Sequence, residues 1–407
     1  MSAALAAWLA WAADDAPKPR PGADRAAIDN GRVLATLGNC NLCHTTDRGA
    51  SFAGGRALIT AFGTLYATNI TPDPETGIGR WSLEDFRRAM REGVAPGGRQ
   101  LYPAFPYDHY ASVSLPDIDA IYAYLMTRDA VRAMAPPNDL RPPYGTRPLI
   151  GLWKALYFHP QPVVADPARS AEWNRGRYLV DGIAHCGACH TPRNGLGAED
   201  RDRDLAGGEV EGWHAPALNQ SSPAPVNWTA DALVVYLRSG FDQNHGASRG
   251  PMAPVTRNLA SVPETDVRAI AVYIASRAGQ SKVGPSVAMK REQIGDPPGG
   301  NDEGAVLYEG ACAGCHNSGT RGVRLENSTT VTDVVSTNMV RVIADGVNPA
   351  EGEPSRSMPG FRGALTAAQI AAVARYVRAR YSRAAPWADL EAEVSKLLGQ
   401  RPPGSAS

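Results

Sequence analysis

Three short stretches of this chain combine cysteine and histidine in the same order. Each reads Cys-x-x-Cys-His, and together they contain every cysteine of the 407-residue sequence. Two thiols at this spacing can form thioethers with the two vinyl groups of one porphyrin, while the histidine turns back to ligate the iron. The motifs therefore predict covalent c-type haem at three positions. The residues are the pairs Cys40 and Cys43, Cys186 and Cys189, and Cys312 and Cys315, followed by His44, His190 and His316.

Zinc binding and disulfide chemistry are the alternatives to haem for such motifs. A structural zinc site needs a second Cys or His pair nearby, whereas these motifs stand far apart in the sequence. A redox-active Cys-x-x-Cys does not require histidine after the second cysteine every time. Three complete copies therefore favour haem over both alternatives.

The sixth iron ligand can be sought among the methionines. A haem domain that only carries electrons usually has a Met ligand, because a soft thioether favours the reduced iron and raises its potential. Met252 and Met358 both lie in Gly- and Pro-containing loops shortly before an amphipathic segment. We expect them to be the distal ligands of the second and third haems.

The corresponding place near the first motif holds Phe105, which cannot bind iron. His109 is the nearest candidate ligand, and imidazole in place of a thioether would lower the potential of that haem. Two alternatives stay open: another ligand such as Met90 or Met126, or an open or water-filled position.

The elements that must position these motifs recur three times. A segment with glycine and an apolar pair precedes each motif, as at Gly31, Gly176 and Gly304, and would form an opening helix. A closing helix follows, with apolar residues at the i, i+3, i+4, i+7 spacing of one helix face. Three stripes in one register indicate duplicated units. They are Ile118/Ile121/Tyr122/Leu125, Val267/Ile270/Ala271/Ile274 and Ile370/Val373/Ala374/Val377.

This arrangement resembles class I cytochrome c, in which an opening helix with a small residue crosses a closing helix and haem fills the core. The resemblance implies an all-α fold of three tandem class I cytochrome c domains joined by Pro/Gly-rich linkers. The expected parts are a signal or anchor remnant and tether (1–23), domain 1 (24–135), a linker (136–170), domain 2 (171–280), a linker (281–299), domain 3 (300–383) and a C-terminal tail (384–407).

Charge and composition restrict the partners. Basic and acidic residues both number 41, so the polypeptide has no net charge to attract nucleic acid. Few of the basic residues are lysines, so docking must use arginine or apolar surface. The sequence has no dinucleotide fingerprint, phosphate loop or convincing carboxylate pair. We therefore expect no substrate-oxidising site within the chain itself.

Two apolar stretches bear on location. Residues 1–13 are apolar without a basic residue, and are too short to span a bilayer. They fit either a truncated signal or anchor, or an ordinary disordered start; export is expected in both cases, because bacteria attach c-type haem outside the cytoplasm. The patch around Leu149, Trp153, Leu156 and Phe158 fits inter-domain packing or a partner or membrane contact.

Several longer stretches look like the triheme cytochrome c subunits of membrane-associated bacterial dehydrogenases, of which the subunits of quinone-cofactor alcohol dehydrogenases are best known. Those alcohol-oxidising relatives typically carry Met where Phe105 stands. The Phe-Pro-Tyr-Asp-His variant found here is more similar to cytochromes that accompany molybdenum hydroxylases of the isoquinoline-, nicotinate- and aldehyde-oxidising type. The stretches are FGTLYATNITPD (62–73), LYPAFPYDHY (101–110), HTPRN (190–194) and GWHAP (212–216).

The resemblance implies a periplasmic electron-transfer subunit attached to the cytoplasmic membrane. A catalytic dehydrogenase, of the molybdenum hydroxylase type first and the quinoprotein type second, would supply electrons for quinone or a terminal oxidase. The alternative is a haem enzyme or gas-binding protein that uses an open coordination position at the first haem, near His109 and Tyr107. A free shuttle is disfavoured by the size of the chain and by its few lysines.

Overall fold

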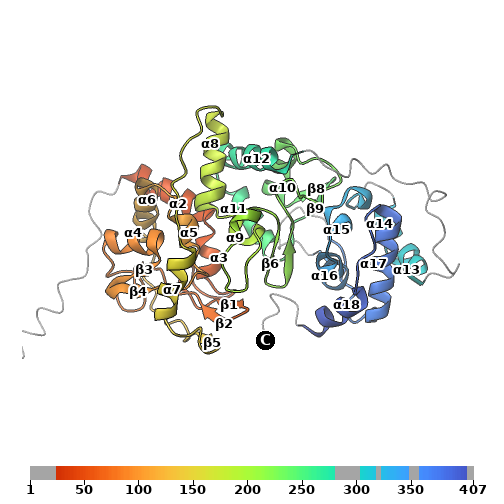
Figure 1. The fold of residues 1–407 in the computed structure, drawn as a ribbon, viewed down its shortest axis with the longest axis horizontal. Coiled ribbons are helices and arrows are strands. Elements are labelled where there is room, and N and C mark those ends of the chain that lie inside the picture. Colours follow the sequence, from red (N-terminus) through yellow and green to blue (C-terminus); the bar gives the residue numbers. More distant parts are fainter. Residues whose placement is uncertain (1–23, 280–302, 318–321, 348–356, 401–407) are drawn as a thin grey trace, which may run out of the picture. The chain divides into compact units, whose positions relative to one another are not determined.

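The structure is a computed structural model, and it describes residues 24–279, 303–317, 322–347 and 357–400 (Figure 1). The expected signal remnant (1–23) and second linker (281–299) lie outside these residues. The chain clusters into two compact units where the sequence suggested three domains. One unit holds Met1–Cys186, Gly195–Ala198 and Ser261–Pro263; the other holds Gly187–Asn194, Glu199–Ala260 and Glu264–Ser407.

The first unit contains the first motif and the opening helix of the second. Its helix α2 packs against α6, as expected for an opening and a closing helix. Gly31 is the reason the two backbones can approach, because a Cβ there would overlap the carbonyl oxygen of Ala120. Its elements are α2 (Arg25–Leu37), α3 (Cys40–His44), β1 (Ala57–Thr60), β2 (Gly63–Tyr66), α4 (Leu83–Glu92), β3 (Val94–Ala95), η1 (Pro96–Gly98), β4 (Arg99–Gln100), α5 (Tyr107–Tyr110), α6 (Leu115–Leu125), β5 (Asp139–Leu140), α7 (Pro148–Tyr157), α8 (Ala171–Tyr178) and the π-helical turn η2 (Leu179–Ile183).

The residues assigned to the first linker fold onto this unit. Strand β5 joins the antiparallel hairpin β1–β2 as a third strand. Helix α7 is fastened by Lys154, whose Nζ donates to the carbonyls of Glu92 (2.6 Å) and Gly93 (2.8 Å). Residues 136–170 are therefore a structured strap as well as a connection.

The apolar patch of α7 divides in two. Trp153 donates its indole N–H to the Leu196 carbonyl at 2.9 Å, and Phe158 packs edge-on against Tyr107. Leu149 and Leu156 remain exposed, with exposed fractions of 41% and 56%. Part of the patch thus packs internally, and part stays open to solvent.

The second unit contains the rest of the second motif's domain and the third motif. Short hairpins again follow the motif helix and the next long helix, as they do in the first unit. Its elements are α9 (Gly187–His190), η3 (Arg201–Arg203), β6 (Gly208–Val210), β7 (Trp213–Ala215), α10 (Ala230–Ser239), β8 (Phe241–Asp242), β9 (Gly246–Ala247), α11 (Met252–Ala260), α12 (Glu264–Ala278), α13 (Glu303–Ala311), α14 (Ala313–His316), η5 (Leu325–Asn327), α15 (Thr329–Thr332), α16 (Thr337–Asp345), α17 (Ala367–Tyr381) and α18 (Leu390–Gly399).

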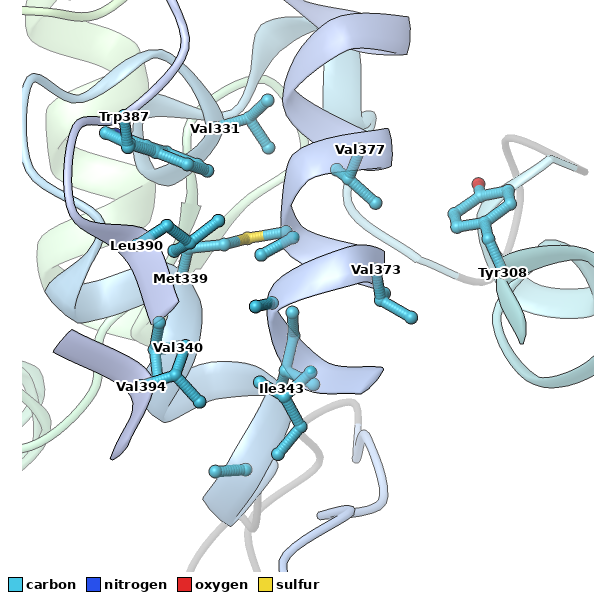
Figure 2. Close-up of a cluster of buried hydrophobic side chains, with 14 of the residues drawn as sticks. Tyr308, Val331, Met339, Val340, Ile343, Val373, Val377, Trp387, Leu390 and Val394 are labelled. Carbon is cyan, nitrogen blue, oxygen red and sulfur yellow. The ribbon is translucent and has the colours of Figure 1, made fainter. Parts of the chain in front are cut away.

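The part of the second unit that carries the third motif has an apolar core, built mainly from α13, α16, α17 and α18 (Figure 2). Helix α13 packs against α17, which repeats the crossing seen in the first unit. Leu390, Val394 and Leu397 of α18 are buried in this core. The segment 384–400 is therefore part of the domain, and the boundary expected at residue 383 falls too early.

Four small antiparallel sheets qualify the all-α expectation. They are β1–β2–β5, β3–β4, β6–β7 and β8–β9. Each contains two or three strands of at most four residues, so the sheets shape loops rather than a core. The order motif helix, hairpin, helix, hairpin and closing helix appears at the first and second motifs, which supports their origin as repeats.

Local sequence explains where the helices begin and end. Ser82 and Asp85 form a reciprocal capping box at the start of α4, and Gly93 ends that helix in the left-handed conformation. Thr366 and Gln369 form the same box at the start of α17. Within the described parts of the chain, no helix combines the length and apolar character needed to cross a bilayer.

Candidate functional site

The three Cys-x-x-Cys-His motifs lie on short helical turns that each end at the histidine: α3, α9 and α14. None of the six cysteines forms a disulfide. Burial and the neighbouring Cys43 raise the pKa of the Cys40 thiol to about 12, and burial raises the pKa of Cys312 as well. Redox-active cysteines have the opposite property, a lowered pKa that favours thiolate. The surroundings of Cys40 and Cys312 therefore disfavour redox chemistry at the first and third motifs.

Each motif histidine donates its Nδ1 proton to a backbone carbonyl. His44 reaches the Thr68 oxygen at 2.6 Å, His190 reaches that of Pro216 at 2.7 Å, and His316 contacts that of Val323 at 3.3 Å. A carbonyl can only accept, so the proton must be on Nδ1 and Nε2 carries the lone pair. Histidines that ligate metals are typically oriented in this way.

Burial keeps these imidazoles neutral, which suits ligation. It lowers the pKa of all three histidines, and this effect outweighs the opposing influence of each carbonyl hydrogen bond. A neutral ring with its proton fixed at Nδ1 is the form that binds iron through Nε2. The donor set of each motif, two thiols and this imidazole, fits haem c.

A buried polar network holds the carbonyl that orients His44. Asn69, directly after Thr68, accepts from the Thr71 backbone N–H (2.9 Å) and hydroxyl (2.7 Å) through Oδ1. Its Nδ2 donates to the Val131 carbonyl at 2.7 Å. The FGTLYATNITPD stretch thus orients the His44 ring through the Thr68 carbonyl, which accepts its Nδ1 proton.

The two methionine candidates are both half-buried but lie in different local structures. Met252 opens α11, the short helix before α12, and is half-buried. Met358 is also half-buried, and its backbone pairs with Val347 at 2.8 and 2.9 Å. Their assignment as distal ligands stays a prediction.

Phe105 lies just before α5, where its ring packs near Tyr110 at 5.3 Å between ring centroids. His109, on α5, donates Nδ1–H to the Asp181 carbonyl at 2.9 Å. Its lone pair is therefore on Nε2, the same tautomer as in the three motif histidines. Met90 is buried in α4 and Met126 caps α6. The sixth ligand of the first site stays a prediction, with all its alternatives.

Two residues that the motif pattern does not single out lie beside the first motif. The Tyr110 hydroxyl and His185 Nε2 both point to the carbonyl of Gly38, two residues before Cys40. The sequence contains one signal for this: His185 directly precedes Cys186, where Asn39 and Ala311 precede the other motifs.

Comparison with known proteins agrees with a c-type cytochrome. Residues 299–377 match the model of the family "Cytochrome C oxidase, cbb3-type, subunit III". The chain is 36% identical to the fructose dehydrogenase cytochrome subunit of Gluconobacter japonicus, over 90% of this chain and 82% of that protein. It is 34% identical to the alcohol dehydrogenase (quinone) cytochrome c subunit of Gluconacetobacter polyoxogenes, over 95% and 87%.

A further relative is much longer. The chain is 43% identical to a subunit of the nicotinate dehydrogenase of Pseudomonas putida over 98% of its own length, but it spans only 34% of that protein. Motifs, neutral half-buried histidines and relatives together define a c-type cytochrome that transfers electrons. The chain belongs to the family of cytochrome c subunits of bacterial dehydrogenases.

Proposed function

We propose that the chain is a triheme relay, with one haem c on each motif. The observation that carries this proposal is the shared geometry of His44, His190 and His316: each is half-buried, and each donates Nδ1–H to a backbone carbonyl. Each cysteine pair would hold its haem by thioethers, and each histidine would be the proximal ligand. Three tandem class I domains, modified by the strap and the added C-terminal helix, are the fold we propose for this purpose.

The chain's own contribution is to hold the ligands in place and exclude water. The bound haem would supply a one-electron carrier. The carbonyls of Thr68, Pro216 and Val323 keep the proton on Nδ1, so that Nε2 remains available. Met252 and Met358 would be the distal ligands of the second and third haems and raise their potentials.

We propose His109 as the distal ligand of the first haem. Its Nδ1–H bond to the Asp181 carbonyl supports this, because it leaves the ligating nitrogen unprotonated. Met90 or Met126, or an open position, are the alternatives that spectra of the oxidised protein would identify. An imidazole ligand would give this haem the lowest potential of the three.

The proposed electron donor is a catalytic dehydrogenase of the molybdenum hydroxylase type. The 43% identity to a component of nicotinate dehydrogenase, above the 36% and 34% to the sugar and alcohol dehydrogenase subunits, supports it. A quinoprotein dehydrogenase is the second choice. Quinone or a terminal oxidase would receive the electrons, and the complex would be periplasmic and attached to the membrane.

The test is to purify the tagged holoprotein from its own host with its partner and to add substrate anaerobically. We expect a molybdenum-containing dehydrogenase to co-purify, and its substrate to reduce the haems in full, as followed by absorbance. A quinoprotein in its place would overturn the choice of donor. A protein that purifies alone, with a high-spin haem that binds CO rapidly, would instead favour the haem enzyme alternative.

A further inference from the structure

The residue before the second motif reaches back to the first. His185 Nε2 lies 3.2 Å from the carbonyl oxygen of Gly38, and the ring must be the donor because a carbonyl only accepts. Gly38 is two residues before Cys40, and His185 is bonded directly to Cys186. One hydrogen bond therefore joins the chain segments that carry the two motifs, within the first unit.

Close packing supports this hydrogen bond. A Cβ on Gly38 would lie 3.2 Å from Cδ1 and 3.3 Å from the carbonyl oxygen of Ile183, so any larger residue at position 38 would crowd Ile183. The Tyr110 hydroxyl also donates to Gly38, at 3.4 Å, and its ring contacts His185 edge-on with 5.6 Å between ring centroids. The contact is thus enclosed by side chains on both sides.

The segment before Cys186 is held firmly to the first unit. Tyr178 donates to the Asp117 carboxylate at 2.5 Å, and His109 donates to the Asp181 carbonyl at 2.9 Å. The turn that follows Tyr178 and includes Asp181 is π-helical, a geometry found often at functional sites. His185 itself adopts a φ of 38°, a backbone conformation that residues other than glycine rarely adopt. Such a conformation persists where the surroundings enforce it.

We propose that the His185–Gly38 contact is the route by which an electron passes between the haems on the first and second motifs. The inference rests on the proposed attachment of a haem at both motifs. Tunnelling through covalent and hydrogen bonds is more efficient than tunnelling through space. The route runs from Cys40 along the backbone to the Gly38 carbonyl, across the hydrogen bond to His185, and on to Cys186.

The step is a simple electron exchange. One ferrous haem iron becomes ferric and the other ferric iron becomes ferrous, with no bond made or broken and no proton released. His185 is a positioning residue in this scheme, because it ligates neither iron. Its substitution should change the rate of exchange but leave both redox potentials unchanged.

The experiment compares holoproteins carrying His185→Phe and His185→Gln. Phenylalanine keeps a ring but has no N–H, whereas glutamine keeps an N–H that can reach the carbonyl. His159→Phe is the matched control, since Nε2 of His159 contacts the Leu156 carbonyl at the end of α7 at an exposed position. A flash-generated reductant loads one electron, and absorbance then follows its redistribution among the haems.

We expect redistribution to be several-fold slower in His185→Phe, and close to the normal rate in His185→Gln and His159→Phe. If the haem potentials and the thermal stability of His185→Phe are unchanged, the slower rate reflects weaker electronic coupling between the haems and not a disturbed structure. A normal rate in His185→Phe, or slowing that follows lost stability, would overturn the route. If that variant fails to retain haem, His185→Leu against His185→Gln gives the same contrast.

Haem content is measured first and separates the two proposals. Fewer than three haems in the unsubstituted protein would refute the triheme relay itself. Three haems with an unaltered rate in His185→Phe would refute only the route.

Discussion

Single hydrogen bonds determine what each motif histidine can do. His44, His190 and His316 all direct Nδ1–H to a backbone carbonyl, and burial lowers the pKa of each ring. Both effects select the neutral tautomer with a lone pair on Nε2. The identical arrangement at three distant places in the sequence is difficult to explain unless all three rings serve the same purpose.

The methionine assignments lead to a prediction at the same scale. Met252→Ala should lower the potential of one haem, and Met358→Ala should lower that of another, because each removes a thioether that stabilises ferrous iron. All three haems should stay attached through their cysteines. A redox titration followed by absorbance measures the shift.

The matched control is Met134→Ala, since Met134 is 85% exposed and should leave every potential unchanged. Unaltered titration curves in both the Met252 and the Met358 variants would refute the assignment of these two ligands.

At the scale of elements, pairs of packed helices accompany the first and third motifs. Helices α2 and α6 cross where Gly31 meets Ala120, and α13 packs on α17 in the third motif's domain. The apolar stripes predicted for the closing helices are buried, with Ile118, Val267 and Ile370 fully inaccessible. These helices pack through the face that the sequence periodicity indicates.

The glycine at the first crossing can be tested directly. Gly31→Ala should lower the free energy of unfolding by about 1–3 kcal/mol, the usual cost of overpacking, because its Cβ overlaps the Ala120 carbonyl. Gly151→Ala is the control: this glycine lies in the exposed part of α7 with no other atom near its missing Cβ. It should stabilise by about 0.5–1 kcal/mol. Denaturant unfolding measures both, and equal effects would contradict the crossing.

A buried carboxylate gives a prediction about pH. Burial raises the pKa of Asp333, although His214, 3.5 Å away, opposes the shift. The native state therefore binds the proton more tightly than the unfolded state, and stability is lost as pH rises through the native pKa. Asp333→Asn should be more stable than the unsubstituted protein at pH 7, with the difference shrinking towards pH 4.

The same substitution leaves the backbone contacts of residue 333 in place, since Arg378 and Trp387 both donate to its carbonyl oxygen. Thermal unfolding across this pH range measures the effect. An Asp333→Asn variant that is less stable than the unsubstituted protein at neutral pH would contradict this prediction. It would show that attraction between His214 and Asp333 outweighs the cost of burying the Asp333 carboxylate.

The sequence predicted some elements and missed others for physical reasons. Helix periodicity and glycine spacing predict the opening and closing helices, because these depend on local pattern. The packing of residues 136–170 onto the first unit could not be predicted. It depends on hydrogen bonds from Lys154 to the carbonyls of Glu92 and Gly93, which lie far from Lys154 in the sequence. The His185 contact also escaped prediction, because it needs a left-handed backbone that sequence rarely indicates.

At the scale of the whole molecule, structural units and haem motifs do not coincide. The first unit contains the first motif, the strap and the chain up to Cys186, while the second contains the rest of the second motif and all of the third. Contacts inside the second unit tie its parts together: Asn338 of α16 exchanges two hydrogen bonds with the backbone of His214, at 2.7 and 3.0 Å. Direct hydrogen bonds thus join the part of the second unit that follows the second motif to the part that carries the third.

The central claim, one covalent haem on each of three motifs, is tested most directly by the intact mass of the denatured holoprotein. Covalent haem survives denaturation, because thioether bonds remain when histidine and methionine ligands are lost. The account predicts a mass equal to the polypeptide plus three haems. After proteolytic digestion, each haem should remain on a peptide that contains one Cys-x-x-Cys-His motif. A polypeptide mass with fewer than three haems, or with none retained after denaturation, would contradict it.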